Sequence, residues 1–355
     1  MKTYFLCLTQ YENVGDLLIN KMLIEEFAKF GLVYLDCPHA PDDFRRFLFQ
    51  HKNVIDVNKK FGLSIKKTNI ISVLYFLRKQ KIKLFLQSPG PIKPNSRGIS
   101  HLYFRFIHCM LRLIDVPFCR VGNCCSTIAS RGQRAYFNDT TAIYVRSYDS
   151  VKYIKTLGFQ NVSYIPDLAF LFKNRIPVFP KKKIAVLSFR KVKTDENKFI
   201  DWLRLCIDNL LHNGYNVELV FQVKKDEAFT RSIYNQIKSE NVKFVDELLW
   251  YDSLDYYADK SIVISNRLHS LLIGAVYGAV PLAYIDGDDM TSKIYDVFNS
   301  AITNYELYIT NSEDTAKLDN IISNIDELKK SILDDCSVNA GMCINSINEI
   351  VNSLK

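Results

Sequence analysis

The sequence predicts an α/β protein made of two doubly wound domains in tandem. Short runs of β-branched and aromatic residues alternate with helix-like segments, which is typical of parallel sheets covered by helices on both faces. The alternation stops at residues 174–183, a basic segment with two prolines, and then starts again. The 355 residues, of which 48% are hydrophobic, also exceed what one compact domain of ordinary size contains.

The first domain is expected to span residues 1–175. Its strands are predicted from β-branched and aromatic runs at residues 3–9, 33–37, 83–88, 118–122, 142–146 and 162–166. Residues 16–30 carry the apolar spacing of a helix, and helix-like segments separate most of the later strands. Strands joined by helices in this way predict a parallel sheet.

The second domain is expected to span residues 180–355. Its strands are predicted at residues 184–189, 217–223, 242–245, 262–265 and 280–285. Its helices are predicted at residues 196–212, 226–239 and 267–277. Two further helical patterns follow at 313–333 and 342–354, and one of them is a candidate to pack back on the first domain.

The composition predicts a cytoplasmic protein without a metal centre. No segment approaches the ~18 uninterrupted apolar residues of a membrane-spanning helix, and the N-terminal stretch turns polar too soon for a signal peptide. The nine cysteines include no C-x-x-C pair, so neither a disulfide framework nor a zinc ribbon is indicated. Cys119, Cys124 and Cys125 with His101 and His108 come nearest to a metal cluster, but buried structural cysteines are favoured there.

Charge is distributed unevenly along the chain. The net charge is +8, yet residues 1–175 hold 26 of the 46 lysines and arginines and only 12 of the 38 acidic residues. The positive electrostatic potential of a basic half attracts nucleic acid, anionic lipid or a phosphorylated substrate alike. The alternative is that these charges form a solvated surface with no partner. Nothing resembles a nucleic-acid module. We therefore expect no nucleic-acid partner. Peripheral contact with a membrane through the basic half is also expected.

Ligands of doubly wound sheets bind at the carboxyl ends of the strands, so the loops after strands are where chemistry is expected. Asn13, Gly15 and Asp16 follow the first strand. Gly15 permits a tight turn close to a ligand, and Asn13 or Asp16 can cap the next helix. The Asp16 carboxylate is either such a cap or an acceptor-binding or base-like group. A G-x-G-x-x-G fingerprint is absent, which argues against a dehydrogenase.

Two later loops of the first domain also carry charged side chains. Arg146 ends a strand, where its guanidinium can grip a carboxylate or phosphate through two hydrogen bonds. Asp167 follows the next strand. An ion pair of Arg146 with Asp149 or Asp167 is the alternative of equal weight. The loops at 87–94 and 121–126 also follow strands, and plain connections are favoured for both.

In the second domain, the segment SNRLHS at residues 265–270 joins a strand to a helix. Asn266 can cap that helix, so free amides, the positive helix end, Arg267 and His269 concentrate in one turn. A lone histidine is more often structural, but the neighbouring Arg267 favours an anion site with a proton donor. Lys293 follows the next strand and a polar loop, where it can neutralise a phosphate as a point charge.

Together these motifs resemble the polysaccharide pyruvyltransferase family. The matching residues spread over roughly residues 10–300 and are NVGD at 13–16, VR at 145–146 with Ser150 beyond it, PD at 166–167, NRLHS at 266–270 and Lys293. The R-L-H element is the most specific part. The resemblance implies a GT-B-like architecture, in which two Rossmann-type domains face a cleft.

The resemblance also implies an activity: transfer of the enolpyruvyl unit of phosphoenolpyruvate to two hydroxyls of a sugar, giving a pyruvate ketal on a cell-surface polysaccharide or its lipid-linked precursor. Arg146 and Arg267 are then expected to hold the donor, with Lys293 at its phosphate and His269 as general acid. The residues expected to line the cleft or the acceptor side are Asn13, Gly15, Asp16 and Asp167. Such a reaction requires no metal or redox cofactor.

The sequence departs from the family pattern at three places, one of which is the unusual turn Gly122-Asn-Cys-Cys-Ser126. Ser147 stands where the family usually has an acidic residue, and the family's glycine-rich second loop is Ser88-Pro-Gly-Pro91 here. A glycosyltransferase that uses a nucleotide sugar on the same scaffold is therefore kept as an alternative. A non-catalytic glycan-assembly partner is a third reading, which the presence of Arg146, Arg267, His269 and Lys293 disfavours.

Overall fold

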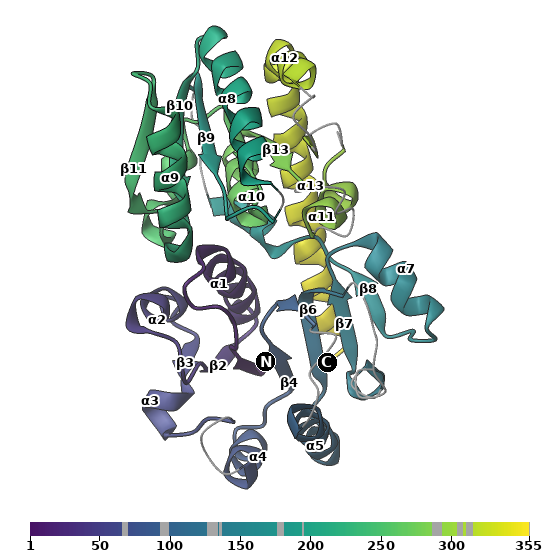
Figure 1. The fold of residues 1–355 in the computed structure, drawn as a ribbon. Helices are drawn as coiled ribbons and strands as arrows, with labels where there is room; N and C mark the ends of the chain where they lie inside the picture. Colours follow the sequence, from purple (N-terminus) through teal and green to yellow (C-terminus); the bar gives the residue numbers. More distant parts are fainter. Residues whose placement is uncertain are drawn as a thin grey trace. The chain divides into compact units, whose positions relative to one another are not determined.

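The computed structural model describes two compact units of the chain (Figure 1). The described residues are 1–65, 70–92, 99–125, 134, 137–175, 181–193, 195–285, 293–303, 308–309 and 315–354. One unit comprises Met1–Tyr11, Asp16–Leu168 and Gly341–Lys355, and the other comprises Glu12–Gly15 and Ala169–Ala340. The centre of the predicted linker, 176–180, and the loop at 286–292 lie outside the described residues.

The first unit contains a parallel sheet in the order β3-β2-β1-β4-β6-β7-β8, with β5 paired to β6. The strands are β1 (Lys2–Leu6), β2 (Leu32–Asp36), β3 (Val54–Asp56), β4 (Leu84–Gln87), β5 (Gly90–Pro91), β6 (Phe118–Cys124), β7 (Ala142–Val145) and β8 (Val162–Tyr164). All six predicted strands are present. The two additional strands, β3 and β5, are too short to show a clear alternation in the sequence.

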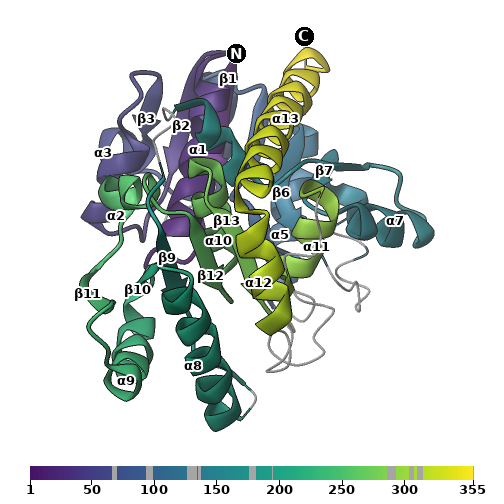
Figure 2. The same ribbon diagram turned by 90° about the horizontal axis from the view of Figure 1, so that it is seen from above.

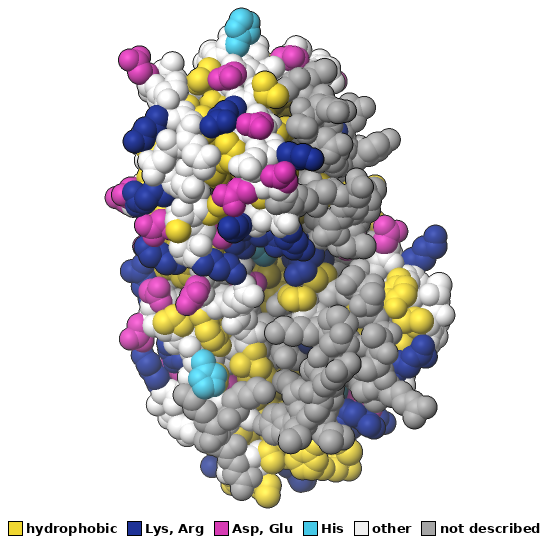
Figure 3. Space-filling view, in the orientation of Figure 1, with side chains coloured by type: hydrophobic (Ala, Val, Ile, Leu, Met, Phe, Trp, Pro, Cys, Tyr) yellow, Lys and Arg dark blue, Asp and Glu magenta, His cyan; other side chains and the backbone are white. Residues whose placement is uncertain are grey.

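Helices cover the first sheet. They are α1 (Val14–Ala28), α2 (Asp42–Leu48), α3 (Val57–Phe61), α4 (Ile70–Lys79), α5 (Ile99–Leu113) and α7 (Tyr148–Thr156). Of these, α1 is buried almost all round, whereas α4, α5 and α7 each have one apolar face. Phe76 of α4 and Ile107 of α5 are buried in one apolar cluster with Phe85 and Phe118 of the strands. Both helices therefore cover the same face of the sheet. Figure 3 shows hydrophobic side chains gathered at the foot of the view, where α4 and α5 lie in Figure 1.

The second unit contains a parallel sheet in the order β11-β10-β9-β12-β13-β14. Its strands are β9 (Ile184–Ser188), β10 (Asn216–Phe221), β11 (Val242–Leu248), β12 (Ile262–Ser265), β13 (Val280–Tyr284) and β14 (Tyr308–Ile309). The five predicted strands correspond to β9 to β13. The chain starts at β9, runs outward to β11 and returns to β12 on the other side of β9. The strand order therefore reverses between β9 and β12, which is where such sheets bind ligands.

The helical elements of the second unit follow its strands, except for the first one, which precedes β9. They are η1 (Leu168–Arg175), α8 (Glu196–His212), η2 (Lys224–Asp226), α9 (Glu227–Ile237), η3 (Tyr251–Tyr257), α10 (Leu268–Tyr277), α11 (Lys293–Ala301) and α12 (Thr315–Ser323). A last helix, α13 (Ile325–Asn352), is continuous over 28 residues and contributes to both units (Figure 2). No helix in the described ranges is long and apolar enough to cross a membrane.

Candidate functional site at the switch point of the second sheet

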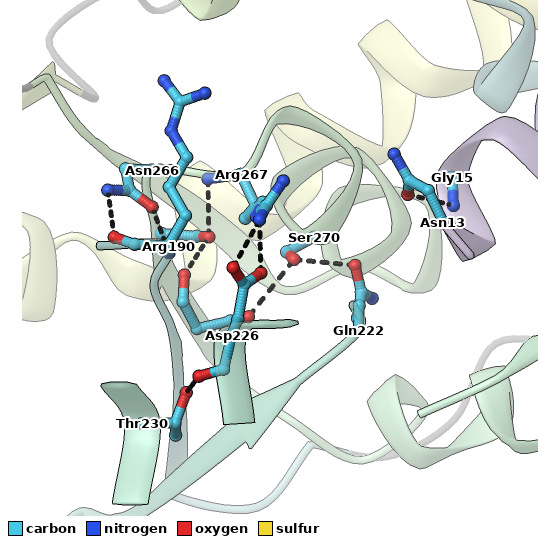
Figure 4. Close-up of polar contacts among 11 residues, drawn as sticks. Asn13, Gly15, Arg190, Gln222, Asp226, Thr230, Asn266, Arg267 and Ser270 are labelled. Carbon is cyan, nitrogen blue, oxygen red and sulfur yellow. Dashed lines mark hydrogen bonds and ion pairs between the residues drawn. The ribbon is translucent and has the colours of Figure 1, made fainter. Parts of the chain in front are cut away.

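The loops after β9 and β12 are tied together at the switch point (Figure 4). The Asn266 side chain accepts a hydrogen bond from the Arg190 backbone N–H at 2.8 Å and donates one to the Arg190 carbonyl at 3.0 Å. Ser265 Oγ donates to the Ser188 carbonyl and accepts from the Arg267 N–H at 2.9 Å. The two strand ends are therefore held in a fixed register by side chains as well as by the sheet.

The expectation that Asn266 caps α10 is wrong. The N-cap position of α10 is Arg267, which has extended backbone angles and no side-chain cap. Asn266 does not reach the helix amides because both ends of its amide group are bonded to Arg190. The first amides of α10 thus have no side-chain oxygen from the N-cap residue, and the positive end of the helix dipole remains next to Arg267.

Arg267 forms an ion pair with Asp226, the last residue of η2 after β10. The Arg267 Nη2 to Asp226 carboxylate distance is 2.5 Å, and the side chains are 17% and 7% exposed. The Asp226 carbonyl accepts a hydrogen bond from the Thr230 hydroxyl at 2.9 Å, which holds this turn against α9. Arg267 Nε is buried without a hydrogen-bond partner in the described part of the chain. Asp226 therefore orients the guanidinium while part of its donor edge stays available to an anion.

Further cations follow the neighbouring strands of this sheet. Arg190 and Lys191 come after β9, and Lys224 and Lys225 come after β10; all four are exposed. We call these four residues and Arg267 the cationic edge. Lys191 pairs with Glu196 at 3.3 Å and Lys224 pairs with Glu227. Figure 4 shows the Arg190 side chain extending away from the bonded cluster around Asn266, so its guanidinium is free of that network.

Arg190 and Asp226 are not among the site residues predicted from the sequence. Arg190 was not singled out because a lone arginine after a strand resembles any exposed cation. Asp226 is 41 residues from Arg267 in the chain, so no local pattern links them. A usable signal was present for both, since Arg190 directly follows the predicted strand 184–189 and Asp226 begins the helix predicted after strand 217–223.

His269 belongs to the first turn of α10, and its ring lies against Gly15. A Cβ atom added to Gly15 would be 2.0 Å from His269 Nδ1. The Gly15 N–H donates to Asn13 Oδ1 at 3.0 Å, and Asn13 forms an isolated antiparallel bridge with Val223 at the end of β10. The turn Glu12–Gly15 thus belongs to the second unit. The structure brings Asn13, Gly15, Arg267 and His269 together in this unit.

The turn of α10 that carries His269 rests on a buried polar network. The Ser270 hydroxyl donates to Gln222 Oε1 at 2.7 Å and lies 3.5 Å from Ser188 Oγ. Gln222 Nε2 donates to the Tyr257 hydroxyl at 2.9 Å. Burial raises the pKa of Tyr257, so its phenol stays neutral. These bonds link β9, β10, η3 and α10, and they restrict the first turn of α10 to one position.

Arg146 and Asp167 form a buried ion pair in the first unit. The Arg146 Nη1 to Asp167 Oδ2 distance is 2.6 Å, and the side chains are 4% and 1% exposed. Arg146 Nη2 also lies 3.6 Å from Cys124 Sγ, and Cys343 Sγ on α13 donates to the Pro166 carbonyl at 3.5 Å. Of the two acidic partners considered for Arg146, the structure selects Asp167. Asp167 is thus an ion-pair partner in a packed environment.

The two other predicted residues lie at helix starts. Asp16 is in the first turn of α1, and its carbonyl accepts a hydrogen bond from Asn20 Nδ2 at 2.7 Å. Asn13, directly before this helix, supplies the side-chain bond to its first amides. Lys293 is the first residue of α11 and is exposed.

His108, Cys119, Cys124 and Cys125, from the grouping of cysteines and histidines, are buried in the first unit. The His108 ring packs against Phe118, with centroids 4.2 Å apart. Burial, and secondarily the Arg120 charge, lower the pKa of His108 to about 3. Burial raises the pKa of Cys119 to about 12. His108 and Cys119 are therefore neutral core groups at physiological pH. The His101 side chain lies outside the described residues.

The fold places the protein in the GT-B-like class, in which both domains are parallel α/β sheets. A UDP-GlcNAc 2-epimerase from Neisseria meningitidis, solved with UDP-GlcNAc, aligns with a TM-score of 0.64 at 13% identity, over 100% of this chain and 99% of that one. A glycosyltransferase from Rickettsia africae aligns at 0.60 and 11% identity, over 99% and 98%. Anabaena HepE, solved in complex with UDP and glucose, aligns at 0.58 and 14% identity, over 99% and 98%.

Within that class, the sequence identifies the family. The sequence model of the family described as polysaccharide pyruvyl transferase matches residues 13–288, which is most of the chain. The protein therefore belongs to the polysaccharide pyruvyl transferase family, and the resemblance noted from its motifs is confirmed. No curated protein matches the chain.

Proposed function

We propose that this protein transfers the pyruvyl group of phosphoenolpyruvate to a sugar of a cell-surface polysaccharide or of its lipid-linked precursor. The observation that carries the proposal is that Arg267 and His269 both lie at the start of α10, at the switch point of the second sheet. Membership of the polysaccharide pyruvyl transferase family supports the same reaction class. We place the reaction in the cytoplasm, where phosphoenolpyruvate is available.

The cationic edge suits a small, densely charged anion. Phosphoenolpyruvate carries a carboxylate and a phosphate, and Arg267 with the amides of α10 offers donors to one of them. Asp226 keeps the Arg267 guanidinium in one orientation, which reduces the entropy lost on binding. Arg190 and Lys293 are the proposed additional contacts to the phosphate. The expected contact of Arg146 with the donor stays a prediction, because the Arg146 guanidinium is buried in its ion pair with Asp167.

His269 is the proposed general acid. A sugar hydroxyl adds to C2 of phosphoenolpyruvate while the imidazolium gives its proton to C3, so that the methylene becomes a methyl group. The second sugar hydroxyl then forms its bond to C2 as the C2–O bond to phosphate breaks. The hydroxyl protons leave with phosphate or return to the imidazole. The products are the cyclic ketal and inorganic phosphate, and no oxidation or reduction takes place.

Release of inorganic phosphate tests the proposal. The purified protein is incubated with phosphoenolpyruvate and a panel of saccharide acceptors, and the product is examined by NMR for a ketal methyl group. Phosphate release that depends on the acceptor is expected. The His269→Gln variant should be inactive. The control is His212→Gln, which replaces an exposed histidine at the end of α8 and should be fully active. Since side chains neutralise the donor, we expect a chelator to leave the rate unchanged.

Two outcomes would contradict the proposal. Release of UDP from UDP-sugars with no reaction of phosphoenolpyruvate would assign the chain to nucleotide-sugar transfer. Full activity of His269→Gln with phosphoenolpyruvate would remove His269 from the chemistry and leave the cationic edge as a binding site alone.

A further inference from the structure

The first unit exposes an apolar surface that none of the proposed chemistry uses. The described part of the chain has seven large hydrophobic side chains that are strongly exposed, and four of them lie on α4 and α5. They are Ile71 at 69%, Tyr75 at 66%, Phe106 at 47% and Leu113 at 73% exposed. Single exposed hydrophobic residues are common, but four on two neighbouring helices form a patch that usually marks an interaction site.

The four side chains point to one side of the sheet. Ile71 and Tyr75 are four residues apart and Phe106 and Leu113 are seven apart, so each pair lies on one helix face. The opposite faces of α4 and α5 are buried in the same apolar cluster, and the two helices contact each other. Their exposed faces therefore both point away from that sheet, as the hydrophobic side chains at the foot of Figure 3 indicate.

Cations lie beside this patch. Lys79 Nζ is 5.8 Å from the centre of the Tyr75 ring. Arg105 and Arg112 line the same groove as Phe106 and Leu113. Arg78, Lys79, Lys81 and Lys83, at the end of α4 and in the turn after it, are exposed. Arg105 and Arg112 on α5 are 51% and 71% exposed at the side chain. Two carboxylates accompany these six cations. Asp139 lies 3.6 Å from Arg105 and 3.7 Å from Arg112, and Asp115 follows α5. The patch therefore has a marked positive charge.

We propose that the α4–α5 surface docks the protein on an anionic phospholipid bilayer. Its composition of aromatic and aliphatic side chains flanked by lysines and arginines is that of elements that lie in the interfacial region of a membrane. Tyr75 is suited to this region because its ring is apolar and its hydroxyl is polar. The cations attract negatively charged headgroups, and the four hydrophobic side chains enter the acyl boundary. The proposal does not depend on the identity of the donor.

The positive charge of the surface favours a bilayer over a second copy of the chain. Two copies that met through this surface would bring two faces of net positive charge together, whereas a bilayer with anionic headgroups neutralises that charge. The attraction falls off within a Debye length, about 8 Å at physiological ionic strength. The binding we expect is therefore peripheral and sensitive to salt.

Vesicle binding of the full chain tests the proposal. The protein is sedimented with vesicles of phosphatidylcholine alone and with vesicles that also contain phosphatidylglycerol. Binding is expected only to the anionic vesicles and is expected to decrease as salt is added. Arg78→Gln with Lys79→Gln should lower the partition coefficient by roughly 5-fold for each charge removed. The matched control is Lys238→Gln with Lys243→Gln, exposed lysines of the second unit, which should bind as the wild type does.

The hydrophobic contribution is tested separately. Phe106→Ser with Leu113→Ser should lower binding to anionic vesicles at least tenfold, while Leu205→Ser, which removes an exposed leucine from α8, should have no effect. Circular dichroism and melting temperature verify that each variant is folded. The proposal would be overturned if the patch variants and the control variants lost vesicle binding to the same extent.

The single exposed cysteine of the chain provides a direct probe. Cys109 on α5 is exposed, whereas the other eight cysteines are buried, and Cys109 lines the same groove as Phe106 and Leu113. An environment-sensitive dye attached to Cys109 should shift to the blue with anionic vesicles. The same dye on Leu205→Cys in a Cys109→Ser background should not shift. A shift that depends on protein concentration without vesicles would show a dimer interface and overturn the proposal, as would no shift at all.

Discussion

At the scale of single residues, local rules predicted some features of the candidate site and missed others. Gly15 was expected in a tight turn near a ligand, but it lies in the first turn of α1, where it approaches His269. Asn266 was expected to cap a helix because its position in the sequence fits that role, but bonds to Arg190 take both ends of its amide. Local chemistry identifies which residues can act, whereas contacts across the sheet decide which partner each one finds.

His269→Gln should separate chemistry from binding. If the ring is the proton donor, its loss lowers turnover by about 10²–10⁴-fold while the dissociation constant of the donor changes little. Single-turnover kinetics and calorimetric titration with phosphoenolpyruvate measure the two effects. His212→Gln is the control for a histidine that has no contact with the site. A variant whose donor affinity falls as much as its turnover would contradict this role.

Gly15→Ala should reproduce much of the defect of the His269 variant. The added methyl group would lie 2.0 Å from His269 Nδ1, so the ring or the turn at residues 12–15 must move. We expect a large loss of turnover in a protein that is still folded, measured by phosphate release and by circular dichroism.

Gly341→Ala is the matched control, since its Cβ would meet nothing within 4 Å. Its position in α13 predicts a gain of up to about 1 kcal/mol in the free energy of unfolding and no change in rate. Wild-type activity in Gly15→Ala would show that the close approach of glycine and ring is not required.

At the scale of elements, the strands were predictable because buried parallel strands are nearly continuous apolar runs. The sequence expectations placed β9 to β13 within a few residues of their observed ends. The strands that were missed, β3, β5 and β14, have two or three residues each and leave no period to detect. The pairing of elements escaped prediction, and so did the contact of η2 with the start of α10 through Asp226 and Arg267.

Asp226→Asn tests whether η2 acts through Arg267. Removing the charge that orients the guanidinium should lower kcat/KM roughly tenfold, whereas Arg267→Ala should weaken donor binding by about 2–5 kcal/mol. If Asp226 acts only through Arg267, its substitution should have no further effect in the Arg267→Ala background.

Asp246→Asn is the control, because it breaks an exposed ion pair with Arg231 that is expected to contribute little. Additive losses in the double variant would contradict a positioning role for Asp226.

At the scale of the whole molecule, the alternation of strands and helices was sufficient to predict two doubly wound domains. The interleaving of the chain was predicted only in part: one of the last two helical patterns was expected to pack on the first domain, whereas the grouping of Glu12–Gly15 with the second unit was not expected. The turn Glu12–Gly15 and the segment Gly341–Lys355 each group with the unit that is distant in sequence. Such grouping depends on side-chain contacts such as that of Cys343 with the Pro166 carbonyl, which no periodicity encodes.

Buried His108 should make the stability of the protein depend on pH. Its pKa in the folded protein is lowered to about 3, so between roughly pH 6.5 and 3 the unfolded chain binds a proton that the folded chain does not. The stabilisation is complete above pH 6.5 and is lost as the pH falls, by up to about 1.4 kcal/mol per pH unit.

Melting curves of the wild type and of His108→Leu, compared from pH 7 to pH 4, measure this effect. The carboxylates are common to both proteins, so the difference between the two curves isolates His108. We expect the wild type to lose stability faster than the variant as the pH falls. If the melting temperatures of the two proteins fell in parallel with pH, the His108 ring would have the same charge in the folded and the unfolded state.

The path of α13 has a consequence for synthesis on the ribosome. Domains of multidomain proteins usually fold in order, beginning with the N-terminal one. Here the first unit contains buried residues of α13, among them Cys343, Ile347 and Ile350, which are translated only after the whole second unit. Until they arrive, the apolar surface that they cover stays open in the nascent chain. The first unit can therefore complete its folding only after the second unit has been translated.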